Sequence, residues 1–98
     1  MRYCIIINNK IKEEYDSETE ALPRLKLKNS KLVKIPDICI GLKIYSNQND
    51  EIKYIGEIVD ESENLWFTRK SEKQDILDPW MNGNFEQKYI DGIFVVEE

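Results

Sequence analysis

The amino-acid sequence predicts a β-rich α+β fold, in which a small curled antiparallel sheet or barrel of five to seven strands carries one short helix. Isoleucine, whose branched side chain favours strands, occurs fourteen times, whereas alanine, the best helix former, occurs once, at Ala21. Short apolar runs separated by polar turns recur along the chain. A length of 98 residues suits one core, so we expect residues 1–98 to form a single globular domain.

The N-terminal segment predicts a buried strand followed by a hairpin. Residues 2–7 contain the run Ile5-Ile6-Ile7, which is apolar on both faces and typical of a central strand. Asn8-Asn9 is a turn signal because asparagine tolerates a left-handed backbone. We therefore expect residues 11–15 to return as a second, antiparallel strand.

One short helix is expected near residues 17–22. Ser17 and Glu20 form a capping box, and the acidic residues around them suit the positive end of the helix dipole. Pro23 lacks an amide hydrogen, so the helix should end within one or two turns.

A basic hairpin is predicted next. Leucine alternates with basic residues over 24–28, and residues 31–35 are apolar enough to return as its partner strand. The stretch 21–36 carries five basic residues and no acid. These residues are Arg24, Lys26, Lys28, Lys31 and Lys34.

The middle of the chain predicts an antiparallel meander. Its three strands are expected at 38–45, 51–59 and 65–69, with polar turns over 46–50 and 60–64. This pattern is similar to SH3-like and PUA-like barrels over about a third of the chain, and the similarity implies architecture rather than function.

Two details of the meander bear on its curvature. Gly41 and Gly56 fall inside the expected strands, which indicates bulges or bends that curl a sheet. Strict alternation would place Ile52, Tyr54, Gly56 and Ile58 on one face.

The last third predicts turns and then a closing strand. Asp78-Pro79 and Asn82-Gly83-Asn84 are turn signals on either side of Trp80, so we expect a restrained loop over 78–84. A short helical turn at 72–77 and a final strand over 89–96, bent at Gly92, complete the fold. Trp80 is either an exposed interface anchor or a plug that closes the end of the barrel.

Several classes of site are excluded by the residue types. The chain has no histidine, its four glycines are scattered, and it lacks a CxxC pair. These features argue against a nucleophile–base pair, a phosphate-binding loop and a zinc site. Residues 47–51 lack the carboxylate spacing of a calcium loop. We expect no enzymatic activity, no cofactor and no metal.

The cysteines and the apolar runs indicate the compartment. Cys4 and Cys39 lie in apolar runs, so we expect two reduced core thiols, with a disulfide as the alternative if their strands pair. No run approaches the roughly 20 apolar residues of a membrane span or resembles a signal peptide. We expect a cytoplasmic protein, and the isoleucine and lysine bias is typical of AT-rich bacteria and their phages.

The net charge of −5 hides a segregation of charge. Residues 13–20 carry five acids and no base, and residues 57–63 carry four acids and no base. Such faces either keep a protein soluble or steer it toward a basic partner.

The main functional hypothesis is a non-enzymatic acidic inhibitor of a protein with a basic surface. Its form would be an immunity protein that neutralises a toxin, or a phage-type inhibitor of a host nuclease. The expected interface residues are Glu57, Asp60, Glu61, Glu63, Asp75, Asp78 and Trp80.

The alternative is a β-barrel module that binds nucleic acid or a modified base. It would use the five basic residues of the expected hairpin (Arg24, Lys26, Lys28, Lys31 and Lys34) for phosphates and an exposed aromatic ring for stacking. The overall acidity argues against this alternative, because the acidic lobes repel a phosphate backbone.

Overall fold

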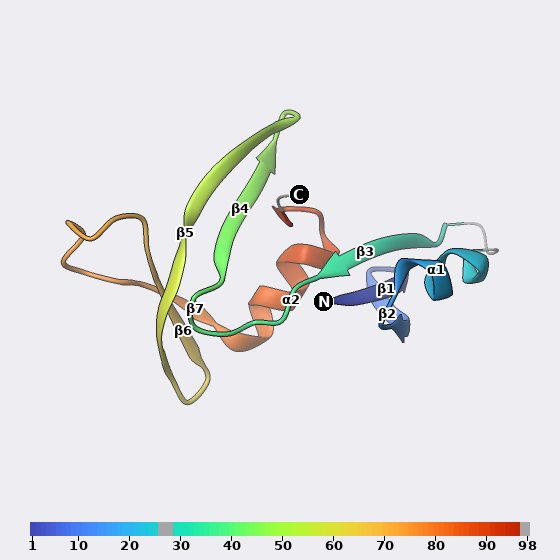
Figure 1. Ribbon diagram of the computed structural model, residues 1–98, viewed down its shortest axis with the longest axis horizontal. Helices are drawn as coiled ribbons and strands as arrows, with labels where there is room; N and C mark the ends of the chain where they lie inside the picture. The colour runs from blue at the N-terminus through green and yellow to red at the C-terminus, as the bar shows by residue number, and fades with distance from the viewer. Residues whose placement is uncertain (26–28, 97–98) are drawn as a thin grey trace.

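The computed structural model describes residues 1–25 and 29–96, and it confirms a β-rich α+β fold with 49% strand and 17% helix. Its strands form two sheets instead of the one expected, in the orders β2-β1-β3 and β7-β6-β5-β4-β8. The longer helix, α2, lies between the sheets (Figure 1). The five-stranded sheet is curled into a half-barrel, as the strand pattern predicted.

The first sheet begins with the predicted hairpin. Strand β1 (Arg2–Ile7) pairs antiparallel with β2 (Lys10–Tyr15). Asn8 and Asn9 have φ values of 54° and 61°, so both adopt the left-handed backbone that a tight hairpin turn needs. Strand β3 (Lys31–Ile35) pairs with the other edge of β1, which makes β1 the central strand.

The predicted helix is confirmed, whereas Arg24, the expected first residue of the next strand, does not lie in a strand. In α1 (Glu18–Ala21) the Ser17 hydroxyl accepts a hydrogen bond from the Glu20 N–H at 3.3 Å. The chain continues into a 3₁₀ turn, η1 (Leu22–Arg24). Arg24 is therefore helical, and β3 pairs with β1. Lys26 and Lys28 lie outside the described residues.

The predicted meander is confirmed with shifted boundaries. The first strand begins at Lys43 instead of residue 38, and each turn contains only two residues, Asn49-Asp50 and Glu63-Asn64. Residues 46–48 and 60–62, which were expected in turns, therefore belong to strands. The strands are β4 (Lys43–Gln48), β5 (Glu51–Ser62) and β6 (Leu65–Arg69).

Gly56 marks a bulge, as predicted. Its φ of +155° is one that residues with side chains rarely adopt, and a Cβ there would lie 3.0 Å from the carbonyl oxygen of Arg69. The register between β4 and β5 shifts beside it. The shift breaks the expected alternation, because Ile52 and Tyr54 are exposed whereas Ile58 is fully buried. Gly41 lies in a turn rather than in a strand.

The C-terminal prediction is mostly wrong. Asp78–Met81 forms strand β7, and the next helix, α2 (Asn82–Ile90), starts directly after it, so no 78–84 loop exists. The bend at Gly92 is confirmed with φ +77°. There the Ile93 N–H donates to the Lys88 carbonyl at 2.9 Å, which ends the helix. The expected strand over 89–96 shrinks to β8 (Phe94–Val95).

One core joins the two sheets. Aromatic rings from α2 and β8 occupy its centre, where the Phe85 and Phe94 ring centroids are 5.8 Å apart and those of Tyr89 and Phe94 are 5.6 Å apart. Isoleucines from both sheets surround them. The buried cluster is Cys4, Ile6, Ile35, Ile44, Ile58, Phe85, Tyr89, Ile90 and Phe94.

Both cysteines are free, but only one is in the core. Cys4 is buried in β1, where burial raises the pKa of its thiol. Cys39 is exposed, so its predicted core position is wrong. Neither α-helix in the described part of the chain has the length and apolar character of a membrane span.

Candidate protein-interaction surface

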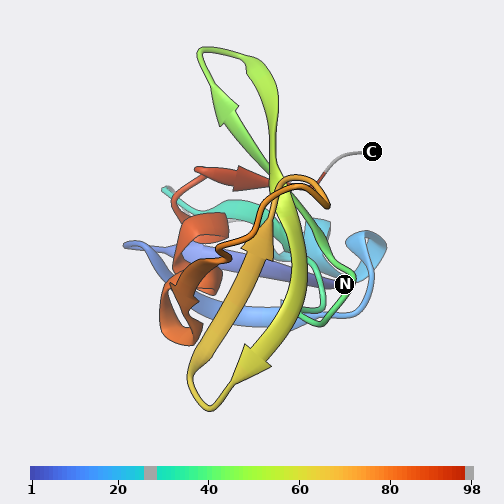
Figure 2. The same cartoon turned by 90° about the vertical axis from the view of Figure 1, so that its left-hand side faces the viewer.

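The far end of the β5–β6 hairpin carries three neighbouring carboxylates. Asp60 and Glu61 lie near the end of β5, Glu63 lies in the turn, and all three are exposed. We call these three residues the acidic tip. The turn lies well away from the first sheet in Figure 1 and at the bottom of the molecule in Figure 2.

The hairpin end is held in place from α2. The Asn82 N–H donates to the Asn64 carbonyl at 2.7 Å, and the Trp66 indole N–H donates to Asn82 Oδ1 at 2.8 Å. Within the tip, Asp60 Oδ1 accepts the Glu61 N–H at 2.8 Å. These bonds fix the backbone that presents the carboxylates.

The acidic tip takes part in no ion pair among residues 1–25 and 29–96. Every recorded ion pair uses a cation from the first 24 residues. They are Met1 ammonium–Asp37 at 3.3 Å, Arg2–Glu14 at 2.9 Å, Arg2–Glu86 at 3.5 Å and Arg24–Glu13 at 3.3 Å. The tip carboxylates are therefore accessible to solvent or to a partner.

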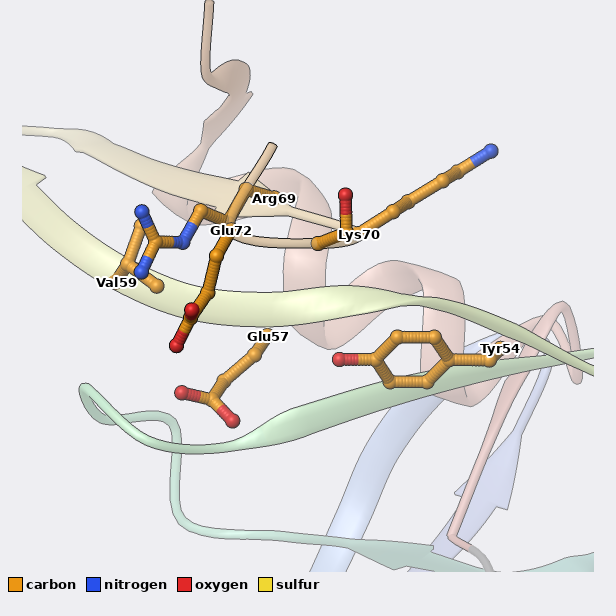
Figure 3. A pocket seen from close by; sticks show the side chains of 7 residues that line it. Tyr54, Glu57, Val59, Arg69, Lys70 and Glu72 are labelled. Carbon is orange, nitrogen blue, oxygen red and sulfur yellow. The ribbon is translucent and has the colours of Figure 1, made fainter. Parts of the chain in front are cut away.

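Glu57 is separated from the acidic tip by the bulge between Ile58 and Asp60. It lies opposite Lys43 on β4 and Arg69 on β6, and it lines a pocket of about 190 Å³. Figure 3 shows the Glu57 and Glu72 side chains pointing in the same direction, with Tyr54 farther along β5. Burial and the Glu57 charge raise the pKa of Tyr54. Because Arg69 and Lys70 also line the pocket, it has no dominant sign of charge.

An apolar patch borders the acidic tip on the outer face of β6 and β7. Trp66 and Trp80 point to the opposite face, where they pack against the core. Side chains alternate along a strand, so the residues directly before and after each tryptophan must point outward. Leu65 pairs with Met81, and Phe67 pairs with both Pro79 and Asp60, so the patch and the tip are neighbours. This outer patch consists of Leu65, Phe67, Pro79 and Met81, of which Met81 is 61% exposed.

Trp80 packs inward, as the core alternative expected. Its indole N–H donates to Thr68 Oγ1 at 2.9 Å, and its ring lies 5.5 Å from Phe94 and 5.8 Å from Phe85. The ring is half-buried. Its neighbours in the strand, Pro79 and Met81, provide the exposed apolar surface instead.

Asp75 and Asp78 lie toward the other end of β6. Asp78 pairs with Thr68, three residues from Leu65 at the tip end of β6, so these acids do not join the acidic tip. The Gln74 amide orders this loop by accepting the Lys70 N–H and donating to the Ile76 carbonyl and to Asp78. Ile76, which is 83% exposed, was missed because an isolated apolar residue carries no sequence signal.

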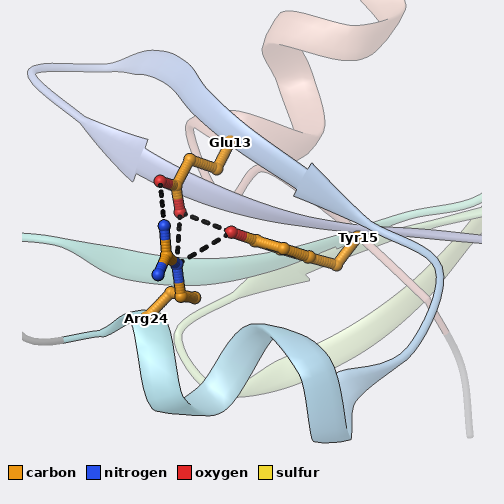
Figure 4. A network of polar contacts seen from close by, with 3 residues as sticks. All are labelled: Glu13, Tyr15 and Arg24. Atoms are coloured by element: carbon orange, nitrogen blue, oxygen red, sulfur yellow. Dashed lines mark hydrogen bonds and ion pairs between the residues drawn. The ribbon is translucent and has the colours of Figure 1, made fainter.

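The expected basic surface is not assembled among the described residues. Arg24 donates to Glu13 and to the Tyr15 hydroxyl, which itself donates to Glu13 at 2.8 Å (Figure 4). Hydrogen bonds from Tyr15 and Arg24 lower the pKa of Glu13. Lys31 and Lys34 lie on β3, three residues apart, so they point to opposite faces.

No group of three or more histidine, cysteine or acidic residues converges as a metal site within the described ranges. No protein-family model, curated protein or solved structure matches the chain. Function therefore has to be inferred from the surface itself, where an acidic tip adjoins an exposed apolar patch.

Proposed function

We propose that this chain is a non-enzymatic binding protein that inhibits a protein partner with a basic surface. The partner class is a toxin, which an immunity protein neutralises, or a nuclease, which a phage inhibitor blocks. The observation that supports this proposal is the acidic tip, whose three carboxylates have no cationic partner among the described residues and whose Asp60 lies beside Phe67 of the outer patch.

The charge distribution supports a basic partner. Residues 43–81, which include β4 to β7, carry nine acids and five bases, whereas residues 1–42 carry six acids and eight bases. The segment that contains β4 to β7 therefore has a net charge of −4, whereas the segment before it has a net charge of +2. Such a field raises the rate of encounter with a positive surface and disfavours acidic partners.

The combination of surfaces resembles the usual anatomy of a protein interface. Interfaces commonly have an apolar centre with a polar or charged rim. Here the outer patch would be the centre and the acidic tip part of the rim. Because α2 already fixes the hairpin through Asn82, little conformational entropy is lost when the tip binds.

The test is an inhibition assay against a panel of purified basic nucleases and nuclease toxins, with binding measured in parallel at low and physiological salt. The tip variant Asp60→Asn/Glu61→Gln/Glu63→Gln should weaken binding and inhibition by about tenfold or more, because it removes the steering charges. The matched control Asp16→Asn/Glu18→Gln/Glu20→Gln removes three charges near α1 and should change binding by less than about twofold.

A second variant distinguishes the contribution of the outer patch to binding from the contribution of charge attraction. Met81→Asp adds negative charge to the outer patch, so pure charge attraction predicts tighter binding, whereas burial of the patch predicts weaker binding. We expect weaker binding. Association with none of the basic proteins, together with low-salt binding of an oligonucleotide that is lost in Lys31→Glu, would contradict the proposal and favour the nucleic-acid alternative.

A further inference from the structure

A groove lies between the edges of the two sheets, on a different surface from the acidic tip. Its volume is about 310 Å³, and residues of β3 line one side while residues of β8 and the following segment line the other. Figure 2 shows β8 alongside β3. The main lining side chains are Leu32, Val33, Tyr89, Phe94, Val95 and Val96.

Both walls of the groove are strand edges. β3 is an edge strand of the first sheet, and β8 is an edge strand of the five-stranded sheet. β3 pairs with β1 on its far side, and β8 pairs with β4 on its far side. The backbone edges that border the groove are therefore those that an additional strand would use, since peptide groups at a sheet edge are a template for pairing.

The floor of the groove is apolar. Tyr89 and Phe94 are 2% and 3% exposed, and both belong to the buried core. Burial raises the pKa of Tyr89 to about 12, so its hydroxyl stays neutral at physiological pH. Side chains of an inserted strand that point inward would meet rings and aliphatic groups rather than charges.

The β3 wall of the groove carries one basic side chain and no acidic one. Lys34 lines the groove, whereas Lys31, three residues earlier on β3, points to the opposite face and lines a different pocket. The residues up to position 42 have more bases than acids, in contrast to the rest of the chain. An occupant with carboxylates beside its apolar part complements this wall.

We propose that this groove binds an extended apolar peptide segment with an acidic flank, which adds as a strand between β3 and β8 and joins the two sheets. Strand addition of this kind takes its affinity from main-chain hydrogen bonds and its selectivity from the side chains that alternate into the groove. A groove with walls on both sides accommodates one extended segment, which favours a peptide over the edge of a second folded copy.

The probe is a capped octapeptide of two glutamates followed by alternating valine and threonine. Amide hydrogen exchange of the whole protein is measured by NMR with and without saturating peptide. We expect exchange to slow by about tenfold or more at those amides of residues 32–34 and 94–95 that point away from β1 and β4, because they would donate new main-chain hydrogen bonds to the peptide. Amides of β2, the opposite edge of the first sheet, should not change.

Three controls make the result decisive. A peptide with N-methylated valines should not bind, since it cannot donate the ladder hydrogen bonds. Lys34→Glu should weaken binding of the glutamate peptide and strengthen binding of the same peptide with two lysines in place of the glutamates, because Lys34 lines the groove. Lys12→Glu on β2 should change neither. The acidic-tip triple variant should bind the peptide normally, so failure here is distinguishable from failure of the inhibitor proposal.

The proposal is overturned if residues 32–34 and 94–95 exchange at unchanged rates, or if the N-methylated peptide binds equally well. It is also overturned if the free protein is a dimer in solution whose β3 amides are already protected, because a second copy would then occupy this edge.

Discussion

The acidic residues of the two sheets have different surroundings, although the sequence gives both regions a similar density of charge. Glu13 and Glu14 on β2 pair with Arg24 and Arg2. Asp60 and Glu61 on β5 pair with no cation in the described part of the chain. An acidic run therefore indicates an interaction surface only when the fold leaves its carboxylates without internal partners.

Helix α1, beside the first sheet, gives two more acidic residues a structural role. Glu18 and Glu20 lie in the first turn of α1, where negative charge stabilises the helix dipole. Four of the five acids in 13–20 therefore have a structural use, as an ion pair or as part of a helix end. In 57–63, Asp60 only orders its own turn, and the other three acids have no comparable role.

The largest expected effect concerns the hydrophobic core that the two sheets share. Phe85→Ala should cost about 3–5 kcal/mol of stability, because it leaves a cavity in the core between the sheets. Denaturant unfolding is followed by tryptophan fluorescence for the second sheet and by exchange of β1 amides for the first. Both probes should show the same lowered midpoint. Separate transitions would show that the sheets are independent folding units.

Gly56→Ala should destabilise the five-stranded sheet by about 2 kcal/mol, because an alanine at φ +155° is strained and crowds the Arg69 carbonyl. Gly83→Ala is the matched control. An added Cβ at Gly83 meets no atom within 4 Å, and alanine favours the helix, so this variant should be neutral or more stable. Equal melting temperatures for the two variants would refute the strained bulge.

Ser17→Ala should cost about 1 kcal/mol, because it removes the hydroxyl that caps α1. The loss should lower the melting temperature of the whole protein, because the two sheets share one core, and should leave the affinity of the acidic tip for a basic partner unchanged. Thermal melts and the nuclease binding assay measure the two quantities. A parallel loss of binding would mean that the two regions are coupled.

The smallest effect is a pH dependence in the first sheet. The pKa of Glu13 is lowered in the folded protein, so its contribution to stability is present above the unfolded pKa of about 4.3 and is lost as pH falls through the lower folded value. Thermal melts between pH 7 and pH 3 should therefore show a shallower acid loss for Glu13→Gln than for the wild type. Identical pH profiles would rule out the Glu13–Tyr15–Arg24 network as a source of stability.

Local signals in the sequence were reliable where the structure they describe is also local. Asn8-Asn9 formed its hairpin turn, Ser17 capped its helix, and Gly56 marked a bulge. Asn82-Gly83 was misinterpreted as a turn because an asparagine–glycine pair also fits the exposed first turn of a helix. The spacing of Phe85, Tyr89 and Ile90 is the helical signal that should have had more weight.

The candidate site was predictable in part. The acidic residues of the tip could be identified from composition alone. Whether they are paired depends on contacts between distant segments, such as Arg24 with β2, which no local pattern contains. The outer patch was missed because it depends on the pairing of Phe67 with Pro79 and of Leu65 with Met81, and β7 was expected to be a loop.

The most direct test of the central claim is an NMR titration of the wild-type protein with a decalysine peptide at low salt. If the tip carboxylates are the available ones, amide shift changes should be centred on residues 60–64 and should disappear at physiological salt, since screening weakens exposed charge contacts. Residues 13–20 should respond weakly, although they carry five acids and residues 60–64 carry three. Changes centred on 13–20, or spread evenly over both acidic regions, would contradict the account.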